Sequence, residues 1–205
     1  MDKKTQKIIS DFPKEVKLKD SGVVTVRGMM KTDLEKLVEF FNELPEEDKL
    51  FLKDDVTRRS TIETWLGNLD YERILPLVAE VENRIVGDAS LHMHKHGWAR
   101  HVGEIRVVVA KDYQRRGLGS ILAGIIFQIA LGLGLDKIQA QMMDNQIGAR
   151  KAFEKLGFKE EAILKESVMD LKGDKHDLVI MSNSVTELWK RMEDMIVYSE
   201  MRVIG

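Results

Sequence analysis

The stretch VVVAKDYQRRGLGSIL, residues 107–122, decides the fold. It begins with a row of valines typical of a buried strand, passes through a loop with two arginines and two glycines, and continues as an aliphatic segment with helical spacing. The first N–H groups of such a helix have no intrahelical partners and carry partial positive charge. Because Gly117 and Gly119 leave these groups uncovered, the pattern predicts a site for a phosphate-bearing ligand.

The kind of phosphate ligand follows from residues that are missing. A dinucleotide loop needs a third glycine, and Leu122 stands at that position. A nucleoside-triphosphate loop needs a lysine directly after its last glycine, and neither glycine is followed by one. The pyrophosphate of an acyl-CoA remains as a ligand. The loop alone leaves one alternative open, an ordinary strand–helix turn with glycine caps and no ligand.

Composition excludes several other classes of protein. The 205 residues carry 32 basic and 34 acidic side chains, so no overall positive charge attracts nucleic acid. The sequence has no cysteine, which excludes disulfides, thiolate metal sites and cysteine nucleophiles. No segment has the roughly 20 apolar residues needed to cross a bilayer, and the charged start MDKKTQKIIS does not resemble a signal peptide. We therefore expect a cytoplasmic protein that binds neither nucleic acid nor membrane.

Strand and helix patterns alternate along the chain and predict a single α/β (α+β) domain. Two helices are expected to begin with capping boxes, Thr32 with Glu35 and Ser60 with Glu63. The predicted strands lie at 22–30, 74–81, 84–94, 102–110 and 136–143, with a closing hairpin around 172–174 and a hairpin turn at Glu82-Asn83. The predicted helices lie at 31–44, about 60–69, 118–133, 146–157 and 184–199.

Two motifs in the right order resemble those of a known family. Gln114-x-x-Gly-x-Gly after a valine-rich strand resembles the signature of the GNAT superfamily of acyl-CoA-dependent N-acetyltransferases. The later stretch NQIGARKAFEKLGF, residues 145–158, resembles the family's second landmark. The resemblance runs from about residue 22 to residue 181 and implies a GNAT fold, a central mixed, mostly antiparallel twisted sheet flanked by helices.

The resemblance also divides the chain and suggests partners. We expect an N-terminal extension at 1–21, the acetyltransferase domain at 22–183, and an extra C-terminal amphipathic helix and tail at 184–205. The apolar stripe of that helix must be buried on the domain or across a homodimer interface. The implied reaction is transfer of an acetyl group from acetyl-CoA, as co-substrate, to a primary amine of a protein or small molecule. The alternative is an acyl-CoA-binding module of the same fold without turnover.

The resemblance implies a binding site for acetyl-CoA along the first motif and in the second landmark. The strand residues would hold the pantetheine arm and the thioester, the loop would hold the pyrophosphate, and Asn145 would contact the pantetheine. The residues are Val107, Val108, Val109, Gln114, Arg115, Arg116, Gly117, Leu118, Gly119, Ser120, Asn145, Ala149 and Phe153. Many family members have a tyrosine at the position of Phe153 that protonates the leaving thiolate. Phenylalanine has no proton to give, so a two-residue acid–base mechanism is in doubt.

Acetyl transfer to an amine also requires a group that accepts a proton. Glu104 is the candidate, because protein-lysine acetyltransferases of this superfamily carry a glutamate at a similar place on the strand before the loop. A carboxylate beside a buried cleft can have a raised pKa and act as a base. His101 or a histidine of the run His92, His94 and His96 can replace or assist it. We expect no metal at this run, because alternate residues of a strand lie nearly 7 Å apart.

Acceptor recognition is expected between the first two helices, at about 42–62, where acidic residues gather and can attract a cationic amine. A solvated acidic surface is the other explanation for the same residues.

Overall fold

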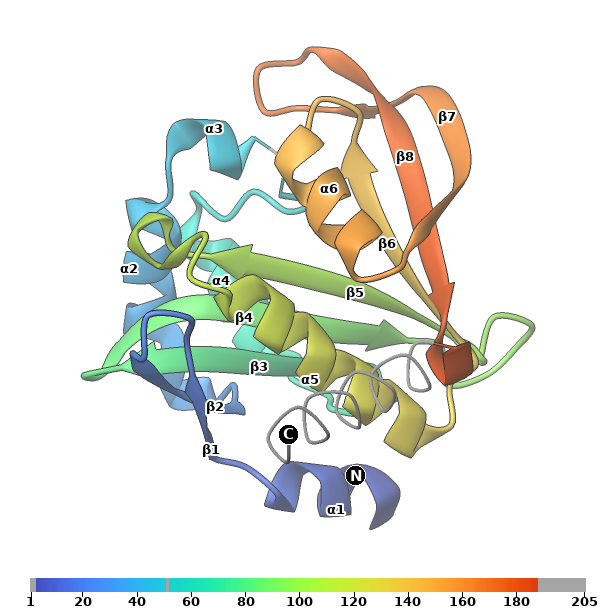
Figure 1. The fold of residues 1–205 in the computed structure, drawn as a ribbon. Coiled ribbons are helices and arrows are strands. Elements are labelled where there is room, and N and C mark those ends of the chain that lie inside the picture. The colour runs from blue at the N-terminus through green and yellow to red at the C-terminus, as the bar shows by residue number, and fades with distance from the viewer. Residues whose placement is uncertain (1–2, 51, 188–205) are drawn as a thin grey trace, which may run out of the picture.

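The computed structural model describes residues 3–50 and 52–187, and its centre is one eight-stranded sheet (Figure 1). The strand order is β1-β2-β3-β4-β5-β6-β8-β7, and every neighbouring pair is antiparallel except β5 and β6. The strands are β1 (Lys14–Lys17), β2 (Val23–Gly28), β3 (Ile74–Val81), β4 (Arg84–Met93), β5 (Val102–Val109), β6 (Lys137–Met143), β7 (Lys159–Met169) and β8 (Lys175–Ser184). The predicted fold class, a mostly antiparallel sheet flanked by helices, is confirmed.

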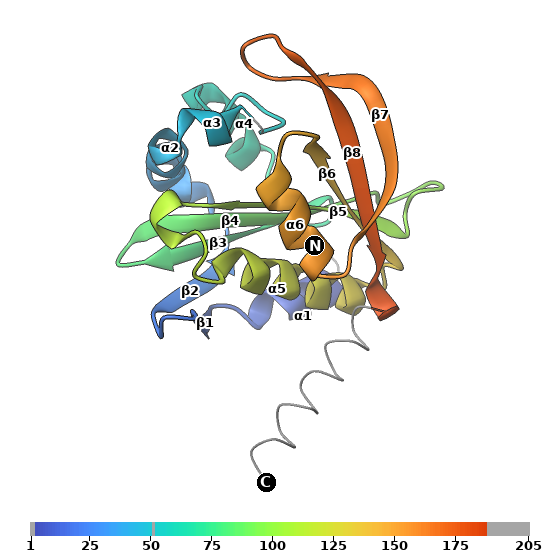
Figure 2. The same ribbon diagram turned by 45° about the horizontal axis from the view of Figure 1, so that its top comes forward.

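Helices cover both faces of the sheet. The helices are α1 (Lys3–Ser10), α2 (Leu34–Glu43), α3 (Glu46–Lys49), α4 (Arg59–Gly67), α5 (Leu118–Leu133) and α6 (Ile147–Lys155). Figure 2 shows α2, α3 and α4 over one face of β3 and β4, with α5 and α1 across the opposite face. None of the described helices is long and apolar enough to cross a membrane.

Alternation along β4 separates an apolar face from a polar one. Gly87, Ala89 and Leu91 belong to the buried core, and a Cβ at Gly87 would meet Leu122 of α5 at 3.1 Å. Asp88, Ser90 and His92 point to the side covered by α2–α4, because successive side chains of a strand alternate between faces. One face of the strand therefore anchors α5, and the other is free to form a site.

The predicted hairpin turn is confirmed, but both predicted capping boxes are wrong. Glu82 and Asn83 have φ values of 47° and 69°, the left-handed conformation that a two-residue hairpin turn needs. Asp33, which is buried, stands directly before α2 in place of Thr32, but its side chain caps the preceding 3-10 turn, Lys31–Asp33, and makes no capping hydrogen bond to the helix. Its carboxylate accepts the Met30 N–H at 2.7 Å and two guanidinium hydrogen bonds from Arg27, each at 2.8 Å.

The second predicted box fails because α4 begins one residue earlier than expected. Arg59 is its first residue, so Ser60 lies inside the helix and cannot cap it. The two glutamates of the predicted boxes, Glu35 and Glu63, both bind the Arg59 side chain. An ion pair between α2 and α4 therefore replaces the two local capping motifs.

The two ends of the chain lie outside the family-like core predicted from the sequence. In the segment 1–21, α1 packs against α5, and β1 adds an edge strand beside β2. Of the predicted C-terminal helix and tail, residues 188–205 lie outside the described residues.

Candidate active site

The parallel strands β5 and β6 separate halfway along their length. Their pairing covers Val102–Glu104 with Lys137–Gln139, after which β5 continues beside β4 as far as Val109 and β6 continues beside β8. Figure 1 shows the two strands diverging from a common point, with α6 in the opening between them. Backbone groups on one edge of the second half of β5 are therefore left without a strand partner, as the resemblance implies for Val107, Val108 and Val109.

The loop after β5 contains two left-handed residues in a tight path. A single turn, Lys111–Tyr113, follows the strand; Arg115 has φ 60°, and Gly117 has φ 94°. The positive φ favours glycine at 117, and a side chain there would in addition press on the Lys19 side chain at 3.2 Å. The Gln114 side chain fixes the loop, because its amide donates to the Val109 carbonyl at 3.2 Å and to Asp48 at 3.1 Å.

The start of α5 is open to an anion. Gly117 is its N-cap and provides no side-chain cap, and the first recorded helical bond there is from the Ile121 N–H to the Gly117 carbonyl at 3.1 Å. The N–H groups of Leu118, Gly119 and Ser120 precede that bond and point out of the helix end. A Cβ at Gly119 would meet Val109 at 3.6 Å, which is an ordinary contact, and Ser120 is exposed.

The two arginines of the loop differ in their surroundings. The Arg116 guanidinium donates to Asp20 at 2.5 Å and stacks on the Tyr113 ring at 4.3 Å. It therefore holds the loop against the turn before β2 and is less free to provide countercharge than the sequence indicated. Arg115 is exposed beside it.

The second landmark lies on the other side of the opening. Asn145 is exposed between β6 and α6, and Ala149 and Phe153 lie on α6, packed against the core. The Phe153 ring contacts Phe158 edge to face at 4.9 Å between centroids. These residues, the loop and the start of α5 flank the region where β5 and β6 separate, which we call the β5–β6 wedge.

Glu104 does not have the raised pKa expected for it. Burial alone would raise the pKa of its carboxyl, but Lys53 at 2.6 Å and Arg106 at 2.9 Å outweigh burial and hold the pKa below its ordinary value. Lys53 is fixed there by a second hydrogen bond to Gln141 at 2.7 Å. The expectation of a raised pKa is therefore wrong, because the sequence did not reveal that two cations from different segments converge on Glu104.

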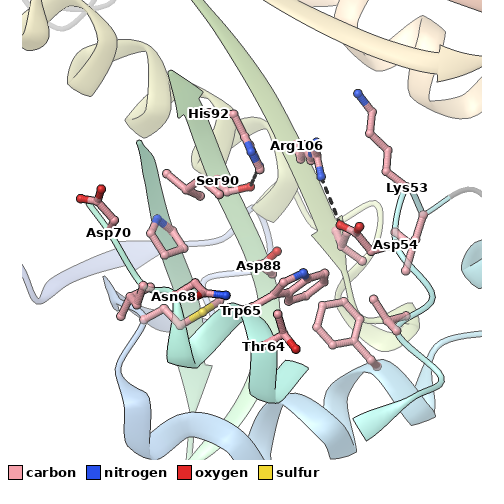
Figure 3. Close-up of a pocket in the computed structure, with 18 residues that line it drawn as sticks. Lys53, Asp54, Thr64, Trp65, Asn68, Asp70, Asp88, Ser90, His92 and Arg106 are labelled. Atoms are coloured by element: carbon pink, nitrogen blue, oxygen red, sulfur yellow. Dashed lines mark hydrogen bonds and ion pairs between the residues drawn. The ribbon is translucent and has the colours of Figure 1, made fainter. Parts of the chain in front are cut away.

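A pocket of about 330 Å³ lies between α4 and strands β3–β5, on the face opposite α5. We call it the α4 pocket. Its walls are apolar and aromatic, and include Phe41, Trp65, Leu69, Ile74, Pro76 and Val108. Its floor is polar: Figure 3 shows Asp88, Ser90 and His92 along β4, with Thr64 and Trp65 of α4 on the other side.

The polar floor contains two groups with strongly shifted pKa values. Burial raises the pKa of Asp88 to about 7, against a weaker opposing effect of Arg106. Burial lowers the pKa of His92 to about 4, so its imidazole is neutral at neutral pH, and its Nε2 lies 3.0 Å from the Ser90 hydroxyl. Sequence reasoning missed Asp88. The available signal was an aspartate inside an otherwise apolar strand, which is unusual for a residue type that is mostly exposed.

The other histidines do not join this floor. β4 ends at Met93, so His94 and His96 follow the strand and are exposed, as is His101. No group of residues suited to a metal ion occurs in the part of the chain that the structure describes.

The acidic residues between the first two helices mostly have other partners. Glu43 binds Arg84 at 2.7 Å and Glu46 binds Lys49 at 2.8 Å. Asp55 accepts a hydrogen bond from the backbone of Thr57 and binds Arg58 at 2.9 Å. Asp54 does line the α4 pocket, but it faces Arg106 at 3.5 Å. Glu43, Glu46 and Asp55 are therefore engaged in ion pairs away from the pocket lining, and Asp54 alone of these four acids lines the pocket.

A model of the acetyltransferase (GNAT) family matches residues 34–158, more than half of the 205 residues. The chain belongs to the GNAT acetyltransferase family. The match includes the β5–β6 wedge, α2–α6 and strands β3–β6, so it confirms the resemblance stated from the two motifs. GNAT proteins use acetyl-CoA as acetyl donor, and the uncapped start of α5 beside the open edge of β5 suits that ligand.

Solved GNAT structures share the fold of this chain. The GNAT domain of S. lividans PAT has a TM-score of 0.70 at 18% identity, covering 83% of this chain and 96% of that one. The ribosomal-protein-alanine N-acetyltransferase of Brucella melitensis has a TM-score of 0.66 at 24% identity, covering 78% and 98%. The yncA protein of Salmonella typhimurium, determined with acetyl-CoA, has a TM-score of 0.67 at 20% identity, covering 79% and 94%. At these identities the likeness concerns the fold alone.

Proposed function

We propose that this GNAT protein transfers an acetyl group from acetyl-CoA to a primary amine by direct attack of the amine on the thioester. The observation that carries the proposal is the uncapped start of α5 next to the unpaired edge of β5. Exposed N–H groups at a helix start favour the charged diphosphate, and strand N–H groups can stabilise the oxyanion that forms at the thioester carbonyl.

The residues predicted for acetyl-CoA surround the wedge in a consistent order. The backbone of Val107, Val108 and Val109 would align the pantetheine arm, and the backbone from Gln114 to Ser120 would hold the diphosphate. Asn145 is exposed at the opposite side of the wedge and can contact the arm. Ala149 and Phe153 pack against the core from α6 and would limit its width.

The amine must lose a proton before attack, because a primary amine is mostly protonated at neutral pH. Glu104 stays a prediction for this role. Its lowered pKa keeps it ionised, but the same two cations that lower the pKa make it a weak base. Cytoplasmic location, and a homodimer formed through the C-terminal helix, also stay predictions.

Two measurements test this function. In a thermal-shift comparison of acetyl-CoA, CoA, NAD and ATP, we expect the two CoA compounds alone to raise the melting temperature, by roughly 5–10 °C at about 100 times Kd. Release of free thiol from acetyl-CoA in the presence of a panel of primary amines then separates an enzyme from a binding module. Stabilisation by CoA with no thiol release from any amine would favour the module. Stabilisation by NAD or ATP alone would contradict the proposal.

A further inference from the structure

Asp88 is a buried acid with an oxygen atom that has no hydrogen-bond partner in the described part of the chain. Its side chain belongs to the floor of the α4 pocket, and the residue is only 8% exposed. Within residues 3–50 and 52–187, its Oδ1 is the one buried side-chain polar atom without a hydrogen-bond partner. An unpaired buried carboxylate is costly, so its presence in a pocket indicates that a ligand completes it.

The cations near Asp88 bind other acids. Arg106 donates to Glu104 at 2.9 Å and faces Asp54 at 3.5 Å. Lys53 binds Glu104 at 2.6 Å, and Figure 3 shows its ammonium group pointing away from Asp88. Arg106 and Lys53 are thus engaged by other acids, and a ligand group with a positive charge and N–H donors would suit Asp88.

The walls of the pocket define the rest of that ligand. Phe41 and Trp65 pack edge to face at 5.7 Å between ring centroids, and Ile74, Pro76 and Val108 add further apolar surface. A volume of about 330 Å³ lies at the small end of the range for small-molecule sites, roughly 300–1,000 Å³. An apolar or aromatic group of a small molecule fits these walls, because the wall residues Phe41, Trp65, Ile74, Pro76 and Val108 carry no charged side chain.

The pocket also meets the β5–β6 wedge at one residue. Asp88 on β4 is the register partner of Val108 on β5, so their side chains lie side by side on the same face. Val108 both lines the pocket and belongs to the strand segment proposed to hold the thioester. By contrast, Glu104 is the register partner of His92, four residues along β4 from Asp88, which is about 13 Å. One amine cannot contact both carboxylates.

We propose that Asp88 binds the reacting ammonium group of the acceptor and takes its proton, and that the acceptor is a small primary amine carried on an apolar or aromatic group. This inference rests on the proposed acetyltransferase function and specifies its acceptor. Burial, which raises the pKa of Asp88 to about 7, also makes it a stronger base than an ordinary aspartate. Glu104 is then a positioning residue that holds Lys53 and Arg106.

The proposed reaction balances with these groups. The ammonium group passes one proton to the Asp88 carboxylate, and the neutral nitrogen forms a bond to the acetyl carbon as the carbon–sulfur bond breaks. The second proton leaves the nitrogen with the departing thiolate, directly or through water, and gives free CoA thiol. Asp88 then returns its proton to solvent, so the net products are an amide, CoA and one proton.

The first test measures binding without turnover. Calorimetric titration compares 2-phenylethylamine with 2-phenylethanol, which has the same apolar group without the charge, on the wild-type protein, Asp88→Asn and the control Asp11→Asn. Asp11 is an exposed carboxylate between α1 and β1, outside the pocket. We expect the wild type and the control to prefer the amine by at least about tenfold, and Asp88→Asn to lose that preference.

The second test compares the acetylation rates of different amines. It also distinguishes failure of the Asp88 proposal from failure of the proposed acetyltransferase function. We expect 2-phenylethylamine to be acetylated with a kcat/KM at least about tenfold above that of the diamine putrescine or of a lysine peptide. An amine preference that survives Asp88→Asn, or a better rate with putrescine or the peptide, would overturn the inference. The acetyl-CoA thermal shift is measured on the same variants. A wild type that shows the acetyl-CoA shift but no preference for the amine would refute the Asp88 proposal alone. A wild type without the acetyl-CoA shift would refute the acetyltransferase function instead.

Discussion

The β5–β6 wedge and the α4 pocket lie on either side of β5. The wedge is formed mainly by main-chain groups and the pocket by side chains. The wedge is formed by the backbone of a continuous segment, from Val107 to Ser120, with α6 closing its far side. The pocket is formed by side chains from α2, the α3–α4 connection, α4 and three strands. A site made of main chain is predictable from a local motif, whereas a site made of distant side chains depends on the whole topology.

The two regions also differ in electrostatics. The wedge ends at the start of a 16-residue helix, whose uncapped N–H groups favour an anion. The pocket ends at a buried acid without a recorded partner, which favours a cation. A donor that carries phosphates and an acceptor that carries an ammonium group therefore suit opposite sides of β5.

The largest expected effect comes from adding a negative charge to the wedge, which should weaken binding of acetyl-CoA and leave binding of the amine in the pocket unchanged. In Gly119→Asp, a carboxylate occupies the space in front of the first N–H groups of α5 and repels a diphosphate. The acid is compatible with the fold, because it suits the helix start and its Cβ would make only an ordinary contact with Val109. We expect acetyl-CoA affinity to fall by about 1,000-fold, or about 4 kcal/mol, with binding of 2-phenylethylamine unchanged.

Gly119→Ala is the matched control, because it adds the Cβ without the charge. Its acetyl-CoA affinity, measured by the same titration, should stay within about tenfold of the wild type. An equal loss in both variants would mean that bulk, and not the anion site, explains the result.

The next effect concerns pH and Asp88. Because the pKa of Asp88 is raised to about 7, its carboxylate form is lost as pH falls through about 7, and kcat/KM for the amine should fall with it. Asp88→Asn should lower kcat/KM by about 100-fold near neutral pH and remove this dependence. The other titratable or charged groups facing the pocket are Lys53, Asp54, Asp70, His92 and Arg106. A wild-type profile that is flat between about pH 6 and pH 8 would contradict the assignment.

The melting temperature of Asp88→Asn shows whether the variant is folded, and the raised pKa of Asp88 predicts the direction in which it changes. An acid with a raised folded-state pKa destabilises the fold once the unfolded chain ionises, from about pH 4 upward, and fully above about pH 7. The raised pKa of Asp88 lowers the free energy of unfolding by at most about 4 kcal/mol at about pH 8 and by less than about 2 kcal/mol at about pH 5. We therefore expect the melting temperature of Asp88→Asn to exceed that of the wild type, more at the higher pH.

A smaller effect is expected from the pocket wall. Trp65→Ala removes the aromatic surface that packs against Phe41 and leaves the wedge untouched. The KM for 2-phenylethylamine should rise about tenfold, whereas the thermal shift with acetyl-CoA should persist. A parallel loss of acetyl-CoA binding would show that pocket and wedge are not independent.

The smallest effect is expected from Glu104→Gln. This change removes the acid that holds Lys53 and Arg106 but leaves Asp88 and the wedge in place. We expect kcat/KM to fall by less than about tenfold, without a change in the pH profile. A loss of 100-fold or more here, together with a small loss in Asp88→Asn, would return the base role to Glu104 as the sequence predicted.

The comparison also explains which sequence predictions succeeded. The strands from β2 to β8, the hairpin at Glu82-Asn83 and the helices α2, α4, α5 and α6 were predictable, because periodicity and turn residues act over a few positions. The short elements α1, β1 and α3 were not predicted. The capping boxes failed where a distant residue intervened. Arg27 holds the Asp33 carboxylate against the turn before α2, and Arg59 binds both Glu35 and Glu63. Local capping rules do not include such partners.

The sequence by itself determined the family, the α/β fold and the position of the loop that we propose for acetyl-CoA, since each depends on residues close together in the chain. Tertiary structure alone decided which carboxylates have raised or lowered pKa values. It places Lys53 and Arg106 on Glu104 and lowers its pKa, and it buries Asp88 in an apolar pocket and raises its pKa. The physical reason is that the pKa of a side chain depends on burial and neighbouring charges, and these come from segments that only folding brings together.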